Sequence, residues 1–324
     1  MTSLHSKPLA LKNVTVTDSF WRTEQELVRT AVIPYQWNAL NDNVPGAAPS
    51  YCMHNFKAAA AQNKRKDTQG KAFVPPKYTF RGFEALPEDP ANPDPDKFYG
   101  FVFQDTDFSK WVEAVGYSLA HYPDPALEQT ADQAIDVVCA AQLDNGYLDT
   151  CYILNDMDRA FTNLRDHHEL YCLGHLVEGA VAYYQGTGKD KLLKAACRFA
   201  YYVDERFGRK PGQLRGYPGH EIAEMALVRL YEVTGEQRYL DLAEYFVTER
   251  GRQPYIFDIQ ADENAKRDAD ANYKPNTDPN RYAYHQANKP VTEQDEAVGH
   301  AVRAGYFYSG LADVARLADD QDLA

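Results

Sequence analysis

Three segments of the chain open with a glycine followed by a histidine, at Gly174–His175, Gly219–His220 and Gly299–His300. A neutral imidazole donates a hydrogen bond from one ring nitrogen and accepts one at the other, so histidines can pair with the hydroxyl groups of a ligand. Each pair is followed by residues with helical spacing. If the segments are copies of one helical unit, their histidines would face one shared pocket. The alternative is that glycine ends a loop, histidine is a modest N-cap, and duplication explains the repetition.

A second pattern in the stretch HHELYCLGH could bind a metal ion. His168, Cys172 and His175 lie at i, i+4 and i+7, on one face of a helix, and zinc accepts nitrogen and sulfur ligands. The H-E-x-x-H motif is absent, because Cys172 takes its final position. The alternative is that His168 faces a ligand pocket beside a buried Cys172.

Carboxylates that could form the acid/base pair of a glycosidase also occur near the starts of expected helices. These residues are Glu221, Glu224, Asp295 and Glu296. We expect most of them to be solvated or to interact with the dipole at a helix N-terminus. Glu296, four residues before His300, is retained as a candidate pocket residue.

Two further stretches supply candidate pocket residues. In FQDTDFSKWVEA, Asp107 stands just before an expected helix, where an N-cap role competes with pocket lining. In QLDNGYLDT, Asn145 and Tyr147 flank a glycine in a turn, so they could lie at a pocket rim or serve only the turn.

The composition is that of a globular protein, with 324 residues, 44% hydrophobic and 25% charged. The net charge of −13 argues against nucleic acid or an anionic membrane as a partner. The five cysteines are scattered without a C-x-x-C pair, so we expect free thiols. No P-loop, G-x-G-x-x-G or G-x-S-x-G motif is present. The N-terminus has no signal-peptide core and no run of about 18 apolar residues occurs, so we expect a cytoplasmic location.

Helical hairpins are the elements that must position these residues. Apolar residues at helical spacing predict helices over 222–233 and 239–247, separated by a turn at Gly235. The preceding segment repeats the pattern with helices over 176–184 and 192–203. His175 and His220 lie 45 residues apart, a period typical of stacked helix pairs.

A fainter copy of the hairpin starts at Trp111 and ends at the turn LDNGY. In each copy the first helix is rich in small and aromatic residues and the second carries charge, which suggests an inner and an outer helix in a toroid. Strand signals are sparse. The best candidate lies within residues 1–20, in LALKNVTVTDSFW, so we expect a small β segment there and a helical array over 21–324.

The last copy opens at Gly299, and aligned on the earlier copies its second helix should begin near Asp322. Helices of this kind usually run for three or four turns. We therefore expect a toroid that is incomplete at its C-terminus. We favour a fragment over a chain that is completed by another polypeptide or by a swapped homo-oligomer.

Four stretches closely resemble glycoside hydrolase family 127, the β-L-arabinofuranosidases. They are PLALKNVTVTDSFW, FTNLRDHHELYCLGHLVEGAVAYYQGTG, GYPGHEIAEMALVRLYEVTGEQRYLDLAEYF and YAYHQANKPVTEQDEAVGHAVRAGYFYSGLADVA. The HELY, PGHE and EAVGHAVR motifs together are specific, and the likeness covers essentially the whole chain. The resemblance implies an all-α (α/α)6 barrel followed by β-sandwich domains, the latter absent here. The implied activity is retaining hydrolysis of a terminal β-L-arabinofuranoside.

The resemblance also implies which residues contact the sugar. By motif they are His168 in HELY, His220 in PGHE and His300 in VGHAVR, whereas His175 is not among them. In the family a zinc-bound cysteine thiolate is the nucleophile and a glutamate is the acid/base. These groups come from motifs of the G-E-A-F and E-T-C types and a later Cys-Cys pair, none of which occurs in residues 1–324. The resemblance thus implies no metal ligand and no catalytic residue here, and zinc only in a full-length family enzyme.

We therefore expect a β-L-arabinofuranosidase-like fragment that keeps sugar-binding histidines and takes a small saccharide as partner. Its other expected partner is the missing C-terminal portion or a second copy of the chain, and we expect little hydrolysis by the chain alone. The alternatives are a carbohydrate-binding remnant without catalysis, or a toroid like the uronyl hydrolases that uses Asp107 or Glu296 as an acid. A purely structural role for the helical array is the remaining option.

Overall fold

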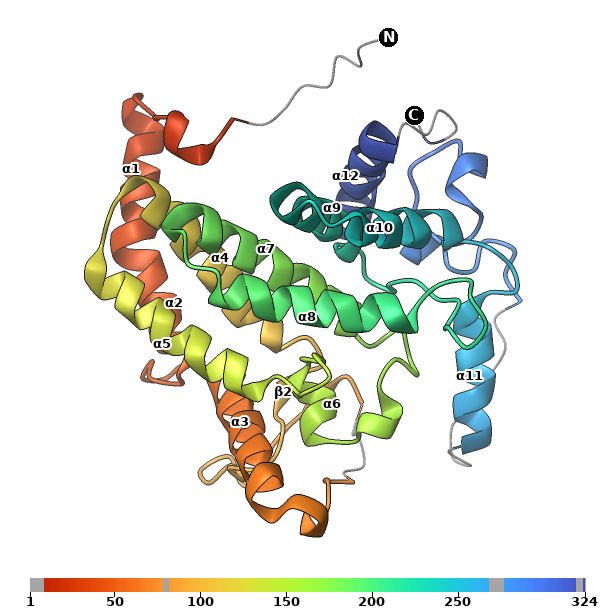
Figure 1. Cartoon of the computed structure of the whole chain (residues 1–324), viewed down its shortest axis with the longest axis horizontal. Coiled ribbons are helices and arrows are strands. Elements are labelled where there is room, and N and C mark those ends of the chain that lie inside the picture. The colour runs from red at the N-terminus through yellow and green to blue at the C-terminus, as the bar shows by residue number, and fades with distance from the viewer. Residues whose placement is uncertain (1–8, 78–81, 268–276, 319–322, 324) are drawn as a thin grey trace. The chain divides into compact units, whose positions relative to one another are not determined.

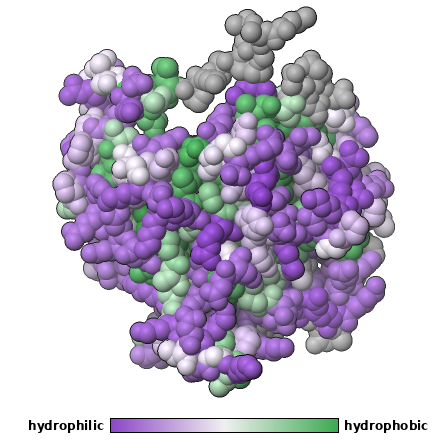
Figure 2. Space-filling model, in the orientation of Figure 1, coloured by the Kyte–Doolittle hydropathy of each residue, from purple (hydrophilic) through white to green (hydrophobic). Residues whose placement is uncertain are grey.

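The computed structural model describes residues 9–77, 82–267, 277–318 and 323, most of them in helices (Figure 1). The chain forms two compact units. Unit 1 comprises residues 1–155 and 176–196, and unit 2 comprises residues 156–175 and 197–324. Helices α7 (Glu169–Thr187) and α8 (Lys191–Arg206) each contribute residues to both units. Hydrophilic residues cover most of the face drawn in Figure 2, in keeping with the charged composition.

Unit 1 is built around α3 (Cys52–Gln69), which packs against α4 (Asp105–His121), α5 (Pro125–Ala141) and α6 (Thr150–Leu154). Its other elements are η1 (Leu11–Asn13), α1 (Ser19–Leu27), η2 (Val28–Val32), α2 (Ile33–Leu40) and η3 (Gly70–Ala72). Trp111 of α4 stacks on Trp37 of α2 and donates a hydrogen bond to the carbonyl of Ile33. The predicted hairpin that contains Trp111 is therefore confirmed as α4 and α5.

The strand predicted near the N-terminus is not formed in the described residues. Leu11–Asn13 form the 3-10 turn η1, and Val14 is extended but exposed and pairs with no strand within the described ranges. The backbone N–H and C=O groups of a strand need a neighbouring strand as their hydrogen-bond partner. The alternating valines give this segment the side-chain pattern of a strand, but they do not provide that neighbour. The strands that the described residues contain are β1 (Glu84–Ala85) and β2 (Gly100–Phe101), an antiparallel pair.

Unit 2 is centred on α9 (Ala223–Thr234), which packs against α10 (Gln237–Glu249) and α12 (Ala301–Ala318). It also contains η4 (Met157–Arg159), α11 (Ile256–Arg267), η5 (Ala283–His285) and η6 (Val291–Glu293). The hairpin predicted over 222–247 is confirmed. Gly235 adopts φ +74° directly after α9, the left-handed conformation that lets the chain turn back into α10.

The start of α7 differs from the prediction. The Gly-His pair at residues 174–175 was expected to open a helix, but α7 begins at Glu169, so His175 lies in its second turn and is buried. The residue that directly precedes α7 is His168. The apolar stripe beyond His175 predicted a helix correctly, but no glycine or proline marked its beginning among the polar residues of RDHHEL.

Helix α12 begins directly after His300, as its Gly-His pair predicts. The second helix of this hairpin, expected near Asp322, falls outside the described residues. None of the helices in the described parts of the chain has both the length and the apolar character needed to cross a membrane.

Candidate functional site

Three histidines from distant parts of the sequence lie together in unit 2, each just before a helix. His168 precedes α7, His220 lies three residues before α9, and His300 precedes α12. The ring centroids of His168 and His220 are 5.5 Å apart, and those of His220 and His300 are 6.3 Å apart. We call these three residues the histidine cluster. The structure thus brings together the three histidines selected by motif.

Aromatic rings from two helices pack around the histidine cluster. Tyr171, one helical turn after His168, has its ring centroid 4.3 Å from that of His220. Tyr306 of α12 lies 6.1 Å from His220. His175 packs between Tyr171 and Tyr306, at 4.5 and 6.0 Å, and is buried behind them. His175 is therefore a neighbour of the cluster, in the second layer of side chains.

Backbone hydrogen bonds determine which nitrogen of each ring carries a proton. Nδ1 of His168 lies 2.8 Å from the carbonyl oxygen of Asp166, and Nδ1 of His220 lies 3.0 Å from that of Glu221. A carbonyl oxygen only accepts, so Nδ1 donates in both rings and Nε2 is the acceptor. In His300 the backbone N–H of Arg303 points to Nδ1 at 3.5 Å, which leaves the proton on Nε2. The cluster therefore offers two acceptors and one donor.

Burial keeps the imidazoles of His168 and His220 neutral. It lowers the pKa of His168 to about 4 and that of His220 to about 3, because a charged ring would lose its hydration. The positive charge of Arg303 lowers both pKa values further. Both rings are neutral at pH 7 and can pair with hydroxyl groups without bringing a charge into the site.

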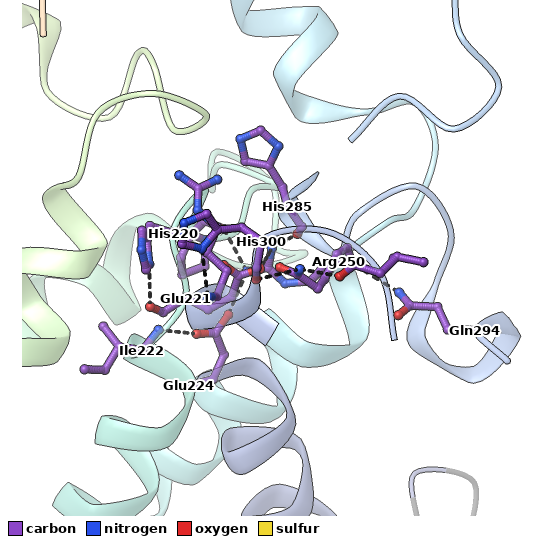
Figure 3. Close-up of polar contacts among 12 residues, drawn as sticks. His220, Glu221, Ile222, Glu224, Arg250, His285, Gln294 and His300 are labelled. Atoms are coloured by element: carbon purple, nitrogen blue, oxygen red, sulfur yellow. Dashed lines mark hydrogen bonds and ion pairs between the residues drawn. The ribbon is translucent and has the colours of Figure 1, made fainter. Parts of the chain in front are cut away.

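Arg250, Glu221 and Glu224 form a buried triad next to His220 (Figure 3). Arg250, at the end of α10, is fully buried and lies 2.9 Å from Oε1 of Glu221. It also donates a hydrogen bond to Oε1 of Glu224 at 2.8 Å. The other carboxylate oxygen of Glu224 accepts a hydrogen bond from the backbone N–H of Ile222. Both glutamates are fully buried. The expectation that Glu221 and Glu224 are solvated is therefore wrong, because the loop before α9 turns both side chains inward onto one guanidinium.

Arg250 connects two loops through their backbones. Its guanidinium donates to the carbonyl oxygen of Pro218 at 2.7 Å and to that of His285 at 2.9 Å. Pro218 lies two residues before His220, so one side chain fixes the His220 loop against the loop that carries His285. Removing one partner of such a buried charge group typically destabilises a protein by about 3–5 kcal/mol.

The two carboxyl groups of the triad share one guanidinium, so they are not equivalent. Burial raises the pKa of Glu221 to about 8, and the negative charge of Glu224 raises it further, although Arg250 opposes the shift. Glu224 has the stronger hydrogen bonds, from Arg250 and from the Ile222 N–H. Glu221 is therefore the carboxyl group that holds a proton at neutral pH.

The glycines of two Gly-His pairs are required by close backbone approaches. A Cβ atom on Gly219 would overlap the carbonyl oxygen of Leu164, in the segment that leads to His168. Gly299 has φ +84°, and a Cβ there would overlap the carbonyl oxygen of Ala283. The glycines thus let the loops that carry the histidines pack directly on one another. This explains the Gly-His pattern better than loop termination alone.

The candidate pocket residues Asp107, Asn145 and Tyr147 belong to unit 1. Asp107 is in the first turn of α4, whose N-cap is Gln104, and it accepts a hydrogen bond from the Gln104 amide. Asn145 is exposed and accepts from the backbone N–H of Tyr147, which is the turn role. Tyr147 is 0% exposed, which places it in the core of unit 1 and not at a rim.

In unit 2, Glu296 is exposed on the loop before His300 and Asp295 pairs with Lys289. Within the described ranges no three His, Cys, Asp or Glu side chains are arranged to hold a metal ion, and this includes His168, Cys172 and His175. The predicted metal site requires His168, Cys172 and His175 to lie on one face of a helix, and therefore requires His168 to be inside that helix. In the structure His168 precedes the first residue of α7. The residues described here therefore do not fit a zinc site.

Sequence reasoning missed three residues of the site, and signals existed for two of them. Tyr171 lies in HELY and Arg303 in VGHAVR, so both stand within the motifs that carry the histidines. Arg250 had no signal. Arg250 lies in the polar run TERGRQ, which reads as a solvated helix end.

Comparisons with known proteins identify the family of the chain. The sequence pattern described as β-L-arabinofuranosidase, GH127 catalytic domain, matches residues 13–324. The chain is 38% identical over 319 residues to a non-reducing end β-L-arabinofuranosidase of Bifidobacterium longum subsp. longum. That match covers 96% of this chain and 44% of the relative, so the chain spans less than half the length of that enzyme.

Two solved structures have a similar fold. A GH127 β-L-arabinofuranosidase from Geobacillus stearothermophilus T6 superposes with a TM-score of 0.81 and 42% identity, over 96% of this chain and 43% of that one. A second GH127 β-arabinofuranosidase superposes with a TM-score of 0.74 and 35% identity, over 98% of this chain and 41% of that one. The predicted all-α class of the (α/α)6 type is confirmed. Over residues 13–324 the chain belongs to glycoside hydrolase family 127, the β-L-arabinofuranosidase family.

Proposed function

We propose that this chain provides the sugar-binding part of a β-L-arabinofuranosidase, and that the histidine cluster binds the terminal arabinofuranose. The observation that carries the proposal is the convergence of His168, His220 and His300 in front of three helices. Membership of the family supports the choice of sugar, because the curated relative acts as a non-reducing end β-L-arabinofuranosidase.

The protonation pattern of the cluster matches a polyhydroxylated ligand. Nε2 of His168 and Nε2 of His220 accept from sugar hydroxyl groups, and Nε2 of His300 donates to one. A hydroxyl group can do both, so three such contacts orient one small ring. Neutral imidazoles suit an uncharged ligand, because no buried charge has to be compensated when the sugar displaces water.

We also propose that hydrolysis uses groups outside these 324 residues. The motifs that carry the nucleophile, acid/base and zinc ligands of the family do not occur in the sequence, and the exposed Glu296 has no carboxylate partner in the histidine cluster to form an acid/base pair. The chain is then expected to bind the sugar and to release little arabinose from p-nitrophenyl β-L-arabinofuranoside. Mixing it with a polypeptide that carries the G-E-A-F and E-T-C motifs should restore release. Turnover by the chain alone would contradict this part.

Binding is tested by calorimetry with methyl β-L-arabinofuranoside. We expect His220→Ala to lower the affinity at least about tenfold, because a buried hydrogen-bond partner of the sugar is removed. His121→Ala is the matched control, since His121 is exposed at the end of α4 in unit 1 and should leave the affinity unchanged. The proposal would be overturned if His220→Ala and the unsubstituted chain bound the methyl glycoside with equal affinity. It would also be overturned if neither protein bound it.

A further inference from the structure

We propose that Tyr284 forms a second subsite, on which the group that carries the terminal arabinofuranose stacks as a saccharide ring. This inference rests on the proposed function, because it assumes that the first sugar lies on the histidine cluster. Tyr284 is 53% exposed, and its ring centroid lies 5.3 Å from that of His300. A flat aromatic face therefore borders the cluster directly.

The orientation of Tyr284 is fixed from one side. The guanidinium of Arg303 lies 4.7 Å from the Tyr284 ring centroid and covers one face of the ring. Arg303 itself is only 7% exposed, and its Nε and Nη1 have no hydrogen-bond partner among the described residues. More than half of Tyr284 stays exposed beside this buried support, so part of the ring surface is available to a ligand.

The backbone under Tyr284 is also fixed. Tyr282 and Gln286 have φ +73° and +50°, so two residues with side chains hold the left-handed conformation on either side of η5. Such conformations cost free energy and persist where surrounding contacts enforce them. Gln286 is buried and donates to the carbonyl oxygen of Val298 at 2.7 Å, and the His300 N–H donates to the carbonyl oxygen of Tyr284. The loop therefore presents Tyr284 in a constant position relative to His300.

Another tyrosine of unit 2 shows which of these features are specific. Tyr201 of α8 is 47% exposed, and Arg238 lies 4.6 Å from its ring centroid. An exposed tyrosine over an arginine is thus not unusual on this surface. Tyr284 differs because it touches a histidine of the cluster and stands on a loop fixed to that histidine. Tyr201 is therefore a matched control for Tyr284.

The chemistry of the subsite identifies its ligand class. Aromatic rings stack on the apolar C–H face of a sugar ring, and Tyr284 offers no charge at its exposed surface. A glycosidase that acts on a terminal sugar must accommodate the unit to which that sugar is attached. The structure assigns this role to Tyr284, which makes it a specificity-determining residue for the ring next to the terminal arabinofuranose.

The test compares two ligands by calorimetry, methyl β-L-arabinofuranoside and a disaccharide with a terminal β-L-arabinofuranosyl unit. We expect the unsubstituted chain to bind the disaccharide about threefold to tenfold more tightly than the methyl glycoside. Tyr284→Ala should remove this preference, and Tyr284→Phe should retain it because the ring remains. Tyr201→Ala should leave both affinities unchanged.

The outcomes separate this inference from the proposed function. If both ligands bind, His220→Ala weakens both, and Tyr284→Ala leaves their ratio unchanged, the second subsite is overturned and the histidine cluster stands. If His220→Ala has no effect on either ligand, the proposed function itself fails. Loss of the preference in Tyr284→Phe would also contradict stacking, since that variant lacks only the hydroxyl group.

Discussion

At the scale of single residues, the site combines neutral imidazoles with two buried guanidinium groups, those of Arg250 and Arg303. His168 and His220 are kept neutral by burial, while Arg250 lies against the carboxyl groups of Glu221 and Glu224. Glu221 holds its proton at neutral pH because burial outweighs the positive charges of Arg250 and Arg303, which both lower its pKa. A negative charge on Glu221 would attract protons to the imidazoles, and would oppose the acceptor role of their Nε2 atoms.

The protonation of Glu221 predicts a pH-dependent stability difference. Its pKa of about 8 in the folded chain lies above the ordinary value of 4.5, so the folded state binds the extra proton between these values. The stability that this proton contributes is fully present below pH 4.5 and is lost as the pH rises to 8. We expect Glu221→Gln, which cannot ionise, to gain stability relative to the unsubstituted chain from pH 5 to pH 8. Above pH 8 the difference should become constant.

Urea unfolding at pH 5, 7 and 9 measures this difference. Asp295→Asn is the control, because Asp295 is exposed and its hydrogen bond with Lys289 lowers its pKa. Any pH-dependent change in stability caused by Asp295→Asn should therefore occur at acid pH, below the range measured for Glu221. Parallel stability profiles for Glu221→Gln and the unsubstituted chain would show that Glu221 is ionised throughout, contrary to the assignment.

At the scale of elements, the loops before the helices determine where the histidines lie. The Gly219 backbone packs against the carbonyl oxygens of Leu164 and Arg165, so the His220 loop and the His168 segment hold each other in place. We expect Gly219→Ala to destabilise the chain by about 1–3 kcal/mol, because the added Cβ forces the two loops apart. Sugar affinity should fall with it, since His168 and His220 separate.

Gly305→Ala provides the matched control in a helix. A Cβ on Gly305 of α12 meets open space, and alanine is the better helix former, so this variant should be stabilised by about 0.5–1 kcal/mol. Thermal unfolding and calorimetry on both variants check the prediction. A Gly219→Ala variant as stable as the unsubstituted chain would show that the loops can part without cost.

The elements were predictable from sequence where periodicity and glycine agreed. Helices α9 and α10 follow the predicted stripes, and Gly235 marks the turn between them. The start of α7 was missed because polar residues fill its first turn, and hydrophobic spacing says nothing about such a turn. The prediction of an N-terminal strand was wrong because alternating apolar and polar residues describe only a side-chain pattern and do not supply a second strand to pair with.

The candidate site was predictable only through motifs. Spacing chose His175 as an equivalent of His220 and His300, whereas resemblance chose His168, which the structure places beside His220. Glu221 and Glu224 looked like solvated helix-start carboxylates, because burial depends on how the loop before α9 turns. The sequence contained no sign of their shared partner Arg250, 26 residues beyond Glu224.

At the scale of the whole molecule, two continuous helices join the two units. Helices α7 and α8 each begin in one unit and end in the other, so unfolding either unit breaks helices that the other needs. We therefore expect one cooperative thermal transition for the whole chain. A ligand that binds only the folded state then stabilises both units together, although the histidine cluster lies wholly in unit 2.

Calorimetric scans with methyl β-L-arabinofuranoside test this coupling. At a ligand concentration of about ten times Kd, binding adds about 1.4 kcal/mol to the free energy of unfolding, which raises the single midpoint by roughly 1–4 °C. The shift should disappear in His220→Ala, because that variant loses the binding and keeps the helices. Two separate transitions, of which the sugar moves only one, would show that α7 and α8 do not couple the units. A shift that persists in His220→Ala would show that the sugar binds elsewhere on the chain.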